Sequence, residues 1–162
     1  MITEINEGQT NLVTAGVTLQ YPGINSCLSI TSVDHQNGTR AGGHAVLIAE
    51  EDQKSLQDIC AYVATNPGDF LFIIGDIGCW NGNWGELPQT QNLMVNGQQV
   101  ESVSGIAAAL NYVAGKFEIF DIRDWHSEDT FDIFFNAQSD GSLFGKTTSG
   151  GAQFTIAGYE RW

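Results

Sequence analysis

Short stretches of apolar and β-branched residues alternate with polar or glycine-rich segments along most of the chain. Runs of about four to eight such residues are typical of β-strands. We therefore predict strands over residues 11–19, 27–33, 44–49, 70–76, 116–123, 130–136, 143–147 and 153–157. Residues 1–8 are expected to be a polar, frayed start. Turn signals are predicted at Tyr21-Pro22-Gly23, over residues 34–43 and at Ser139-Asp140-Gly141-Ser142.

Two segments have the periodicity of helices. An apolar residue recurs at helical spacing from Leu56 to Val63, which predicts an amphipathic helix over residues 53–65. A similar stripe predicts a helix over residues 101–114, ended by Gly115. Residues 78–96 are rich in Gly, Asn, Gln and Trp and are predicted to form a long irregular loop. The order of elements predicts an α+β fold, with a mixed, mainly antiparallel sheet or sandwich flanked by two helices, in a single layered domain over residues 1–162.

Charge narrows the classes of partner. The chain carries 19 acidic residues against 6 lysines and arginines, and its formal net charge is -13. This balance argues against nucleic acid as a partner, because binding to the phosphate backbone requires a basic surface. No apolar stretch is long enough to span a bilayer, and no secretory signal is visible. We expect a monomer that does not insert into membranes and that is cytoplasmic or delivered into a host cell.

The candidate chemistry rests on three cysteines and three histidines. Their spacings match no zinc or disulfide framework, so we predict reduced thiols, no metal and no cofactor. Cys60 lies on the apolar stripe of the first predicted helix and is interpreted as buried and structural. Cys79 lies in the irregular loop and is a competing nucleophile candidate. No histidine is near Cys79 in sequence, although His126 could approach it in space.

Cys27 and His44 form the most informative pair, because each begins a predicted strand. If the two strands lie side by side with both residues at one edge, the thiol meets the imidazole. Such a pair can become a thiolate with an imidazolium, the working form of a cysteine nucleophile. The glycine-containing turn before Cys27 would let backbone N–H groups converge as an oxyanion hole. The candidates for this hole are Asn25, Ser26 and Leu28.

Both residues also have an ordinary structural interpretation. Cys27 can be a small hydrophobic residue in a strand, and His44 can be a hydrogen-bonded histidine beside two glycines. The turn before Cys27 can likewise be a plain connection between strands. The sequence around the pair favours the catalytic interpretation.

The segments Asn-Ser-Cys-Leu-Ser-Ile-Thr and Ala-Gly-Gly-His-Ala-Val-Leu resemble the catalytic segment of the CheD chemotaxis receptor deamidases. More loosely, they resemble the glutamine deamidase toxins of the cytotoxic necrotizing factor type. The specific match runs from Asn25 to Glu50, and the later order of elements is also similar. The threonine expected six positions before the cysteine is replaced by Tyr21, with Thr18 three residues earlier. Later glycine-rich segments of CheD are missing, which favours a divergent deamidase such as a bacterial effector.

The resemblance implies a protein glutamine deamidase, whose partner is the protein that carries the target glutamine. The Cys27 thiolate would attack the side-chain carboxamide, and His44 would transfer protons as ammonia leaves and water hydrolyses the thioester. In this family a threonine hydroxyl, here that of Thr18, or a main-chain carbonyl orients the histidine.

Two other classes of function remain open. A cysteine protease or a transglutaminase would use the same pair of residues. A non-enzymatic domain that binds a glycan or a protein would instead use Trp80 and Trp84 in the irregular loop, together with its asparagines. Both tryptophans can also simply pack on the core beneath that loop.

Overall fold

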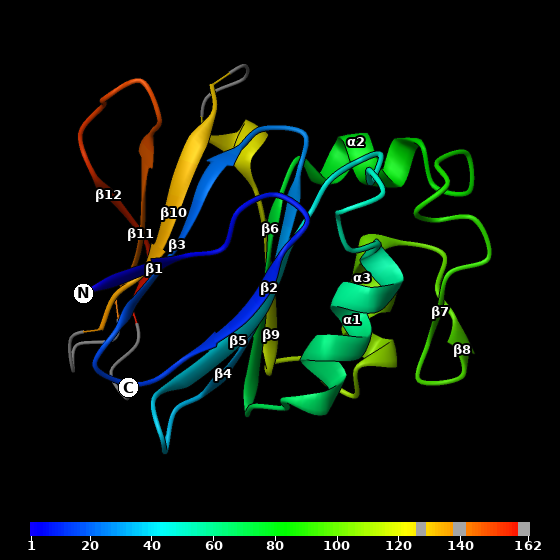
Figure 1. Ribbon diagram of the computed structural model, residues 1–162, viewed down its shortest axis with the longest axis horizontal. Coiled ribbons are helices and arrows are strands. Elements are labelled where there is room, and N and C mark those ends of the chain that lie inside the picture. The colour runs from blue at the N-terminus through cyan, green and yellow to red at the C-terminus, as the bar shows by residue number, and fades with distance from the viewer. Residues whose placement is uncertain (126–128, 138–141, 159–162) are drawn as a thin grey trace.

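The computed structural model describes residues 1–125, 129–137 and 142–158, and it contains two five-stranded sheets packed face to face. Figure 1 shows the two sheets edge-on as neighbouring layers. The first sheet consists, in spatial order, of β1 (Ile2–Glu4), β3 (Thr18–Ile24), β10 (Phe131–Phe135), β11 (Ser142–Thr147) and β12 (Phe154–Gly158). The second consists of β2 (Thr10–Val13), β5 (Thr39–Ala45), β4 (Leu28–Asp34), β6 (Phe70–Gly75) and β9 (Phe117–Asp121).

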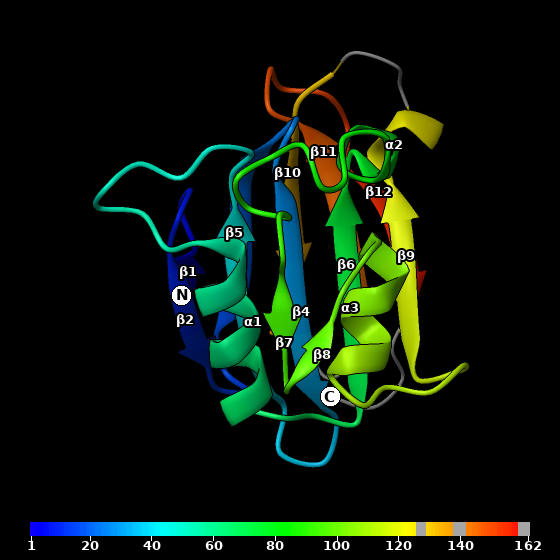
Figure 2. The same cartoon turned by 90° about the vertical axis from the view of Figure 1, so that its right-hand side faces the viewer.

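Among the residues that the structure describes, helices cover only the outer face of the second sheet. Figure 2 shows α1 (Leu56–Thr65) and α3 (Val103–Ala109) in front of this sheet, with the small hairpin of β7 (Met94–Val95) and β8 (Gln98–Gln99) beside them. A short helix α2 (Ile77–Gly82) and a 3-10 turn (Ile122–Asp124) follow the ends of β6 and β9. The predicted α+β class, with a mainly antiparallel sandwich flanked by helices, is confirmed.

Two apolar cores follow from the alternation of side chains along the strands of the second sheet. Leu28 and Ile30 face α1 and α3 and belong to the core beneath the helices. Phe72 and Ile74 face the other way and pack with residues of the first sheet, such as Phe135. Both faces of β4 and β6 are buried, and β6 accordingly reads as a continuous apolar run. β4 instead alternates apolar residues with the buried Ser29, Thr31 and Ser32. No helix in the described ranges has the length and apolar character needed to cross a membrane.

Several predicted boundaries are wrong for identifiable reasons. Residues 1–8 are not frayed, because Ile2–Glu4 pairs in parallel with β3 and Ile5 is fully buried. Tyr21-Pro22-Gly23 lies inside β3, where the register against β10 shifts. Proline and glycine are tolerated in a strand at such a bulge. The predicted loop over residues 78–96 overlaps α2, whose cap Asp76 accepts a hydrogen bond from the Cys79 backbone N–H at 3.0 Å.

The predicted turn over residues 34–43 is too long. Asp34 closes a tighter turn by accepting the backbone N–H groups of Gln36 and Asn37, and β5 already begins at Thr39. The two predicted helices are confirmed as the shorter α1 and α3. Of the predicted turn at residues 139–142, only Ser142 lies within the described residues, and it begins β11.

Candidate active site

The β4–β5 hairpin brings Cys27 and His44 to the same end of the second sheet. The two strands are antiparallel, and Ser29 pairs with His44 while Leu28 pairs with Ala45. In an antiparallel pair, the beginning of one strand lies beside the end of the other. His44 meets Cys27 because it lies near the end of β5, and not at the beginning of a strand as the sequence predicted.

A third residue, Glu7, completes a compact cluster with this pair. The Cys27 sulfur, a ring nitrogen of His44 and a carboxylate oxygen of Glu7 all lie within 4.8 Å of one another. The Cys27 sulfur is 3.9 Å from Glu7 Oε1. Cys27 is 5% exposed and His44 is 0% exposed, whereas Glu7 is exposed to solvent. The sequence analysis missed Glu7 because it lies in the segment predicted to be frayed.

The crossing segment, residues 5–9, carries Glu7 from the first sheet to the second (Figure 1). The backbone N–H of Gly8 donates to the His44 carbonyl at 2.7 Å, and the His44 N–H donates to the Gln9 carbonyl at 3.1 Å. Gly8 has φ +76° and packs so closely on Gln53 that a Cβ would overlap that side chain. Glycine is favoured there because it has no Cβ and adopts positive φ at little cost.

The crossing segment also fixes the His44 ring. His44 Nδ1 lies 3.0 Å from the Ile5 carbonyl oxygen. A carbonyl only accepts, so Nδ1 carries the hydrogen and the neutral ring keeps its lone pair on Nε2. Nε2 is buried and has no hydrogen-bond partner among the described residues. This tautomer is the one that a general base beside a thiol requires.

The structure does not place Thr18 against His44. The Thr18 hydroxyl accepts a hydrogen bond from the backbone N–H of Ala137 at 3.2 Å, at the start of β3. The sequence left two candidates for the group that orients His44, a threonine hydroxyl and a main-chain carbonyl. In the structure the carbonyl of Ile5 is the group that contacts the ring.

Burial sets the protonation of the pair. Burial and, to a smaller extent, the Glu7 carboxylate raise the pKa of the Cys27 thiol, whereas the Asn25 backbone N–H lowers it, and the net value is about 12. Burial also lowers the pKa of His44, opposed by its bond to the Ile5 carbonyl and by the charge of Glu7. The resting pair is therefore a neutral thiol beside a neutral imidazole, and not the ion pair considered from the sequence.

The turn before Cys27 is held from two sides. Trp80 Nε1 donates to the Ser26 carbonyl at 2.9 Å. Arg123 donates from Nη2 to Asn25, and its Nε forms an ion pair with Asp76 at 3.1 Å. Asn25 and Ser26 are exposed, while Leu28 is buried at the start of β4. The sequence analysis missed Arg123 and Asp76, whose contacts join segments far apart in the chain.

The glycine pair before His44 has a packing role on both faces of β5. A Cβ at Gly42 would overlap the hydroxyl of Tyr21, which lies between the sheets. A Cβ at Gly43 would overlap Ile59 of α1. The pair therefore lets β5 approach both layers closely, which accounts for Gly-Gly-His without reference to chemistry.

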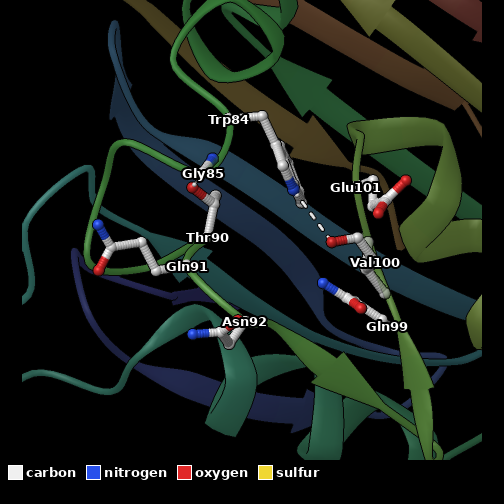
Figure 3. A pocket seen from close by; sticks show the side chains of 8 residues that line it. All are labelled: Trp84, Gly85, Thr90, Gln91, Asn92, Gln99, Val100 and Glu101. Atoms are coloured by element: carbon white, nitrogen blue, oxygen red, sulfur yellow. Dashed lines mark hydrogen bonds between the residues drawn. The ribbon is translucent and has the colours of Figure 1, made fainter.

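The two tryptophans of the predicted loop have different environments. Trp80 is 0% exposed and packs beneath the Ser26 turn, so its side chain presents no surface to a substrate in this structure. Trp84 is half-buried and donates from Nε1 to the Val100 carbonyl at 3.0 Å. It lines a cavity of about 560 Å³ that is shown in Figure 3 and that contains neither Cys27 nor His44. The cavity is lined by Trp84, Gly85, Thr90, Gln91, Asn92, Gln99, Val100 and Glu101.

The other two cysteines lie outside the cluster. Cys60 is 0% exposed within α1, as predicted, and burial raises the pKa of its thiol to about 12. Cys79 is half-buried in α2, where burial and the Asp76 charge raise the pKa of its thiol. Its suggested partner His126 lies outside the described residues.

No known family model matches the chain, and no curated protein matches its sequence. Among solved structures, the chain is similar to the C-terminal domain of CNFy from Yersinia pseudotuberculosis. The TM-score is 0.41 at 9% sequence identity, and the match covers 96% of this chain and 62% of that chain. A similarity this distant assigns neither a family nor an activity to the protein.

Proposed function

We propose that this protein is a thiol-dependent amidohydrolase that converts a glutamine side chain of another protein into glutamate and ammonia. The observation that carries the proposal is the convergence of the Cys27 thiol with His44, whose ring is held by the Ile5 carbonyl with Nε2 left as a base. The choice of glutamine rests on the sequence resemblance over residues 25–50. Delivery into a host cell as a bacterial effector belongs to the same proposal.

In the first half-reaction the Cys27 sulfur attacks the carboxamide carbon, and its proton moves to His44 Nε2. Because the resting pair is neutral, this proton transfer accompanies the attack and does not precede it. The Ile5 carbonyl stabilises the imidazolium through Nδ1–H. His44 then gives the proton to the amide nitrogen, the C–N bond breaks, and ammonia leaves a thioester on Cys27.

In the second half-reaction a water molecule attacks the thioester. His44 Nε2 accepts a proton from this water, and the C–S bond breaks to give the glutamate carboxylic acid. The proton on His44 returns to the departing sulfur, which restores the neutral pair. The cycle consumes one water and releases one ammonia for each glutamine.

The turn at Asn25–Leu28 is the proposed source of oxyanion stabilisation. Its residues Asn25 and Ser26 are exposed to solvent and directly precede the buried Cys27. Trp80 and Arg123 bind acceptor groups of this turn, which keeps the backbone in one conformation before substrate arrives. Preorganised donors of this kind stabilise the charge that develops on a carbonyl oxygen.

The proposal is tested by incubating the protein with mixed bacterial and animal cell extracts and mapping new glutamate residues at glutamine positions by mass spectrometry. We expect new sites with the parent and with the control Cys79→Ser, and none with Cys27→Ser. Sites that persist in Cys27→Ser would contradict the assignment of the nucleophile. Adding a primary amine distinguishes transglutamination, and cleaved chains reveal proteolysis.

A second candidate function is binding of a glycan or a protein at the Trp84 cavity. The observation that favours it is a half-buried tryptophan that lines the same cavity as the amide residues Gln91, Asn92 and Gln99 (Figure 3). Aromatic faces and amide groups together suit a sugar or a polar peptide. Under this alternative Trp84→Ala loses binding and Cys27→Ser keeps it, which is the reverse of the amidohydrolase outcome.

A further inference from the structure

We propose that the Glu7–Cys27–His44 cluster is a binding site for a divalent transition metal, with Zn²⁺ as the best fit. This inference rests on the donor atoms alone and does not depend on the proposed amidohydrolase activity. The sequence predicted no metal because the spacings of cysteine and histidine match no zinc framework. Glu7 reaches the cluster only through the crossing segment, and its contribution is visible only in three dimensions.

The donor set and its spacing suit zinc. Thiolate, imidazole and carboxylate are its three ordinary protein ligands, at about 2.3, 2.0 and 2.1 Å respectively. Tetrahedral geometry with these bond lengths places a sulfur and a carboxylate oxygen about 3.6 Å apart. The Cys27 sulfur and Glu7 Oε1 are 3.9 Å apart, and all three donors lie within 4.8 Å of one another. Side-chain adjustments of up to about 1.5 Å therefore close the site.

The environment of His44 is that of a metal ligand. Histidines that bind metals usually donate their second ring N–H to a carbonyl or carboxylate, which fixes the ring. His44 donates Nδ1–H to the Ile5 carbonyl, and Nε2 is a buried lone pair with no hydrogen-bond partner among the described residues. A metal ion would satisfy this orphaned nitrogen, which is otherwise costly to bury.

Charge and access also agree with a divalent cation. Zn²⁺ displaces the thiol proton to solvent, and the resulting Cys27 thiolate and the Glu7 carboxylate together neutralise the ion. Glu7 is exposed, so an ion reaches the cluster from the solvent side. Three protein ligands leave the fourth tetrahedral position to water, and a bound ion would occupy the sulfur that the proposed function needs free.

The first test uses Co²⁺ as a spectroscopic substitute for zinc in the complete chain. We expect one Co²⁺ per chain, with thiolate-to-metal charge-transfer absorption in the near ultraviolet that zinc abolishes by competition. The band should be lost in Cys27→Ser. In Glu7→Gln the apparent affinity for Co²⁺ should be at least about 10-fold lower. The band should persist in Cys79→Ser, which removes the more accessible thiol. A band that survives in Cys27→Ser, or depends on Cys79, would overturn the proposal.

The second test needs no variant and covers the case in which Cys27→Ser fails to fold. X-ray absorption of the zinc-loaded parent should reveal one sulfur at about 2.3 Å with nitrogen and oxygen at about 2.0–2.1 Å. Zinc should also protect Cys27, and not Cys79, from alkylation. A zinc site without sulfur, or unprotected Cys27, overturns the metal proposal and leaves the amidohydrolase proposal standing. If the protein binds zinc through Cys27 but the metal-free protein converts no glutamine, the metal proposal stands and the amidohydrolase proposal is overturned.

Discussion

At the residue scale, Glu7 controls the resting state of the thiol. Its carboxylate lies 3.9 Å from the Cys27 sulfur, and its negative charge adds to burial in opposing the thiolate. A like charge close to an ionisable group disfavours its charged form. Removing this charge should therefore lower the pKa of Cys27 below its present value of about 12.

We predict that Glu7→Gln speeds the alkylation of Cys27 at pH ~8, by about 10-fold for each unit by which the pKa falls. The measurement is the pH dependence of iodoacetamide labelling at each cysteine, followed by mass spectrometry. Glu4→Gln makes the same charge change outside the cluster and should leave the profile of Cys27 unaltered. Identical profiles for the parent and Glu7→Gln would mean that the carboxylate exerts no control.

The orienting role of the Ile5 carbonyl makes a prediction for Thr18. Thr18→Val keeps the shape of the side chain, and the hydroxyl that it removes accepts from Ala137 and not from His44. We therefore expect the rate of glutamine conversion to be unchanged in Thr18→Val and about 10²–10⁴-fold lower in His44→Ala. Steady-state ammonia release measures both. Equal losses in the two variants would restore Thr18 as the orienting group.

The sequence was informative about some of these residues and silent about others. The pairing of Cys27 with His44 was accessible because a motif-like turn and a glycine pair mark both. Glu7, the Ile5 carbonyl and Arg123 were not accessible, because they reach the site through contacts across 20 or more positions of the chain. Such contacts depend on how the two sheets meet, which no local pattern encodes.

At the scale of elements, the residues at which strands begin and end were harder to predict than whether a segment forms a strand or a helix. The Gly42-Gly43 pair suggested a turn, but it lies within β5, where small residues admit Tyr21 on one face and Ile59 on the other. Tyr21-Pro22-Gly23 likewise suggested a turn and lies at a bulge in β3. Tertiary packing overrode local turn propensity at both places, and this decided which end of β5 carries His44.

Helix α2 supports the Cys27 turn through Trp80, and this gives a prediction about stability. Trp80 is 0% exposed, so Trp80→Ala should lower the free energy of unfolding by about 3–5 kcal/mol. Trp84 is half-buried, so the matched Trp84→Ala should cost clearly less. Urea unfolding measures both variants. A larger loss for Trp84→Ala would contradict the assignment of Trp80 as the core tryptophan.

Trp80→Phe removes the hydrogen bond of this side chain while keeping most of its packing. It keeps an aromatic side chain but removes the N–H that donates to the Ser26 carbonyl at 2.9 Å. A net hydrogen bond is worth about 0.5–1.5 kcal/mol. We expect a stability loss of at least that size, because the smaller ring also leaves part of the indole volume unfilled, but less than that of Trp80→Ala. We also expect a lower rate of glutamine conversion, because the proposed oxyanion turn loses its support.

At the scale of the whole molecule, buried ionisable groups limit the pH range of stability. Burial lowers the pKa of His44 below its ordinary value of 6.5, so the unfolded chain binds this proton more readily. The free energy of unfolding therefore falls as the pH drops below about 6.5. Burial raises the pKa of Cys27 and Cys60 from 9.0 to about 12, so the folded chain holds protons that the unfolded chain loses. Stability therefore also falls as the pH rises above about 9.

We predict a stability maximum between pH ~7 and ~8.5 in urea unfolding, with an alkaline slope of about 1.4 kcal/mol per pH unit for each buried thiol. Cys60→Val removes one such thiol within α1 and should reduce the alkaline slope by about 1.4 kcal/mol per pH unit. An alkaline slope that Cys60→Val leaves unchanged would show that this thiol ionises alike in the folded and unfolded chain.

The overall class was predictable from the sequence, and the arrangement of layers was not. Short apolar runs and two amphipathic stripes are enough to indicate an α+β sandwich flanked by helices. The split of ten strands into two sheets, with the crossing segment between them, follows from long-range pairings such as β1 with β3 and β3 with β10. These pairings create the buried space in which His44 keeps its neutral ring.

Transfer of an acyl group to Cys27 is the most direct test of the central claim. A blocked glutamate carrying an activated γ-ester would acylate the nucleophile without requiring the natural substrate, and peptide mass spectrometry locates the acyl group. We predict acylation at Cys27 in the parent and in Cys79→Ser, slowed about 10²–10⁴-fold in His44→Ala. Acylation of Cys79 would contradict the account, and so would acylation of Cys27 at the same rate in the parent and in His44→Ala.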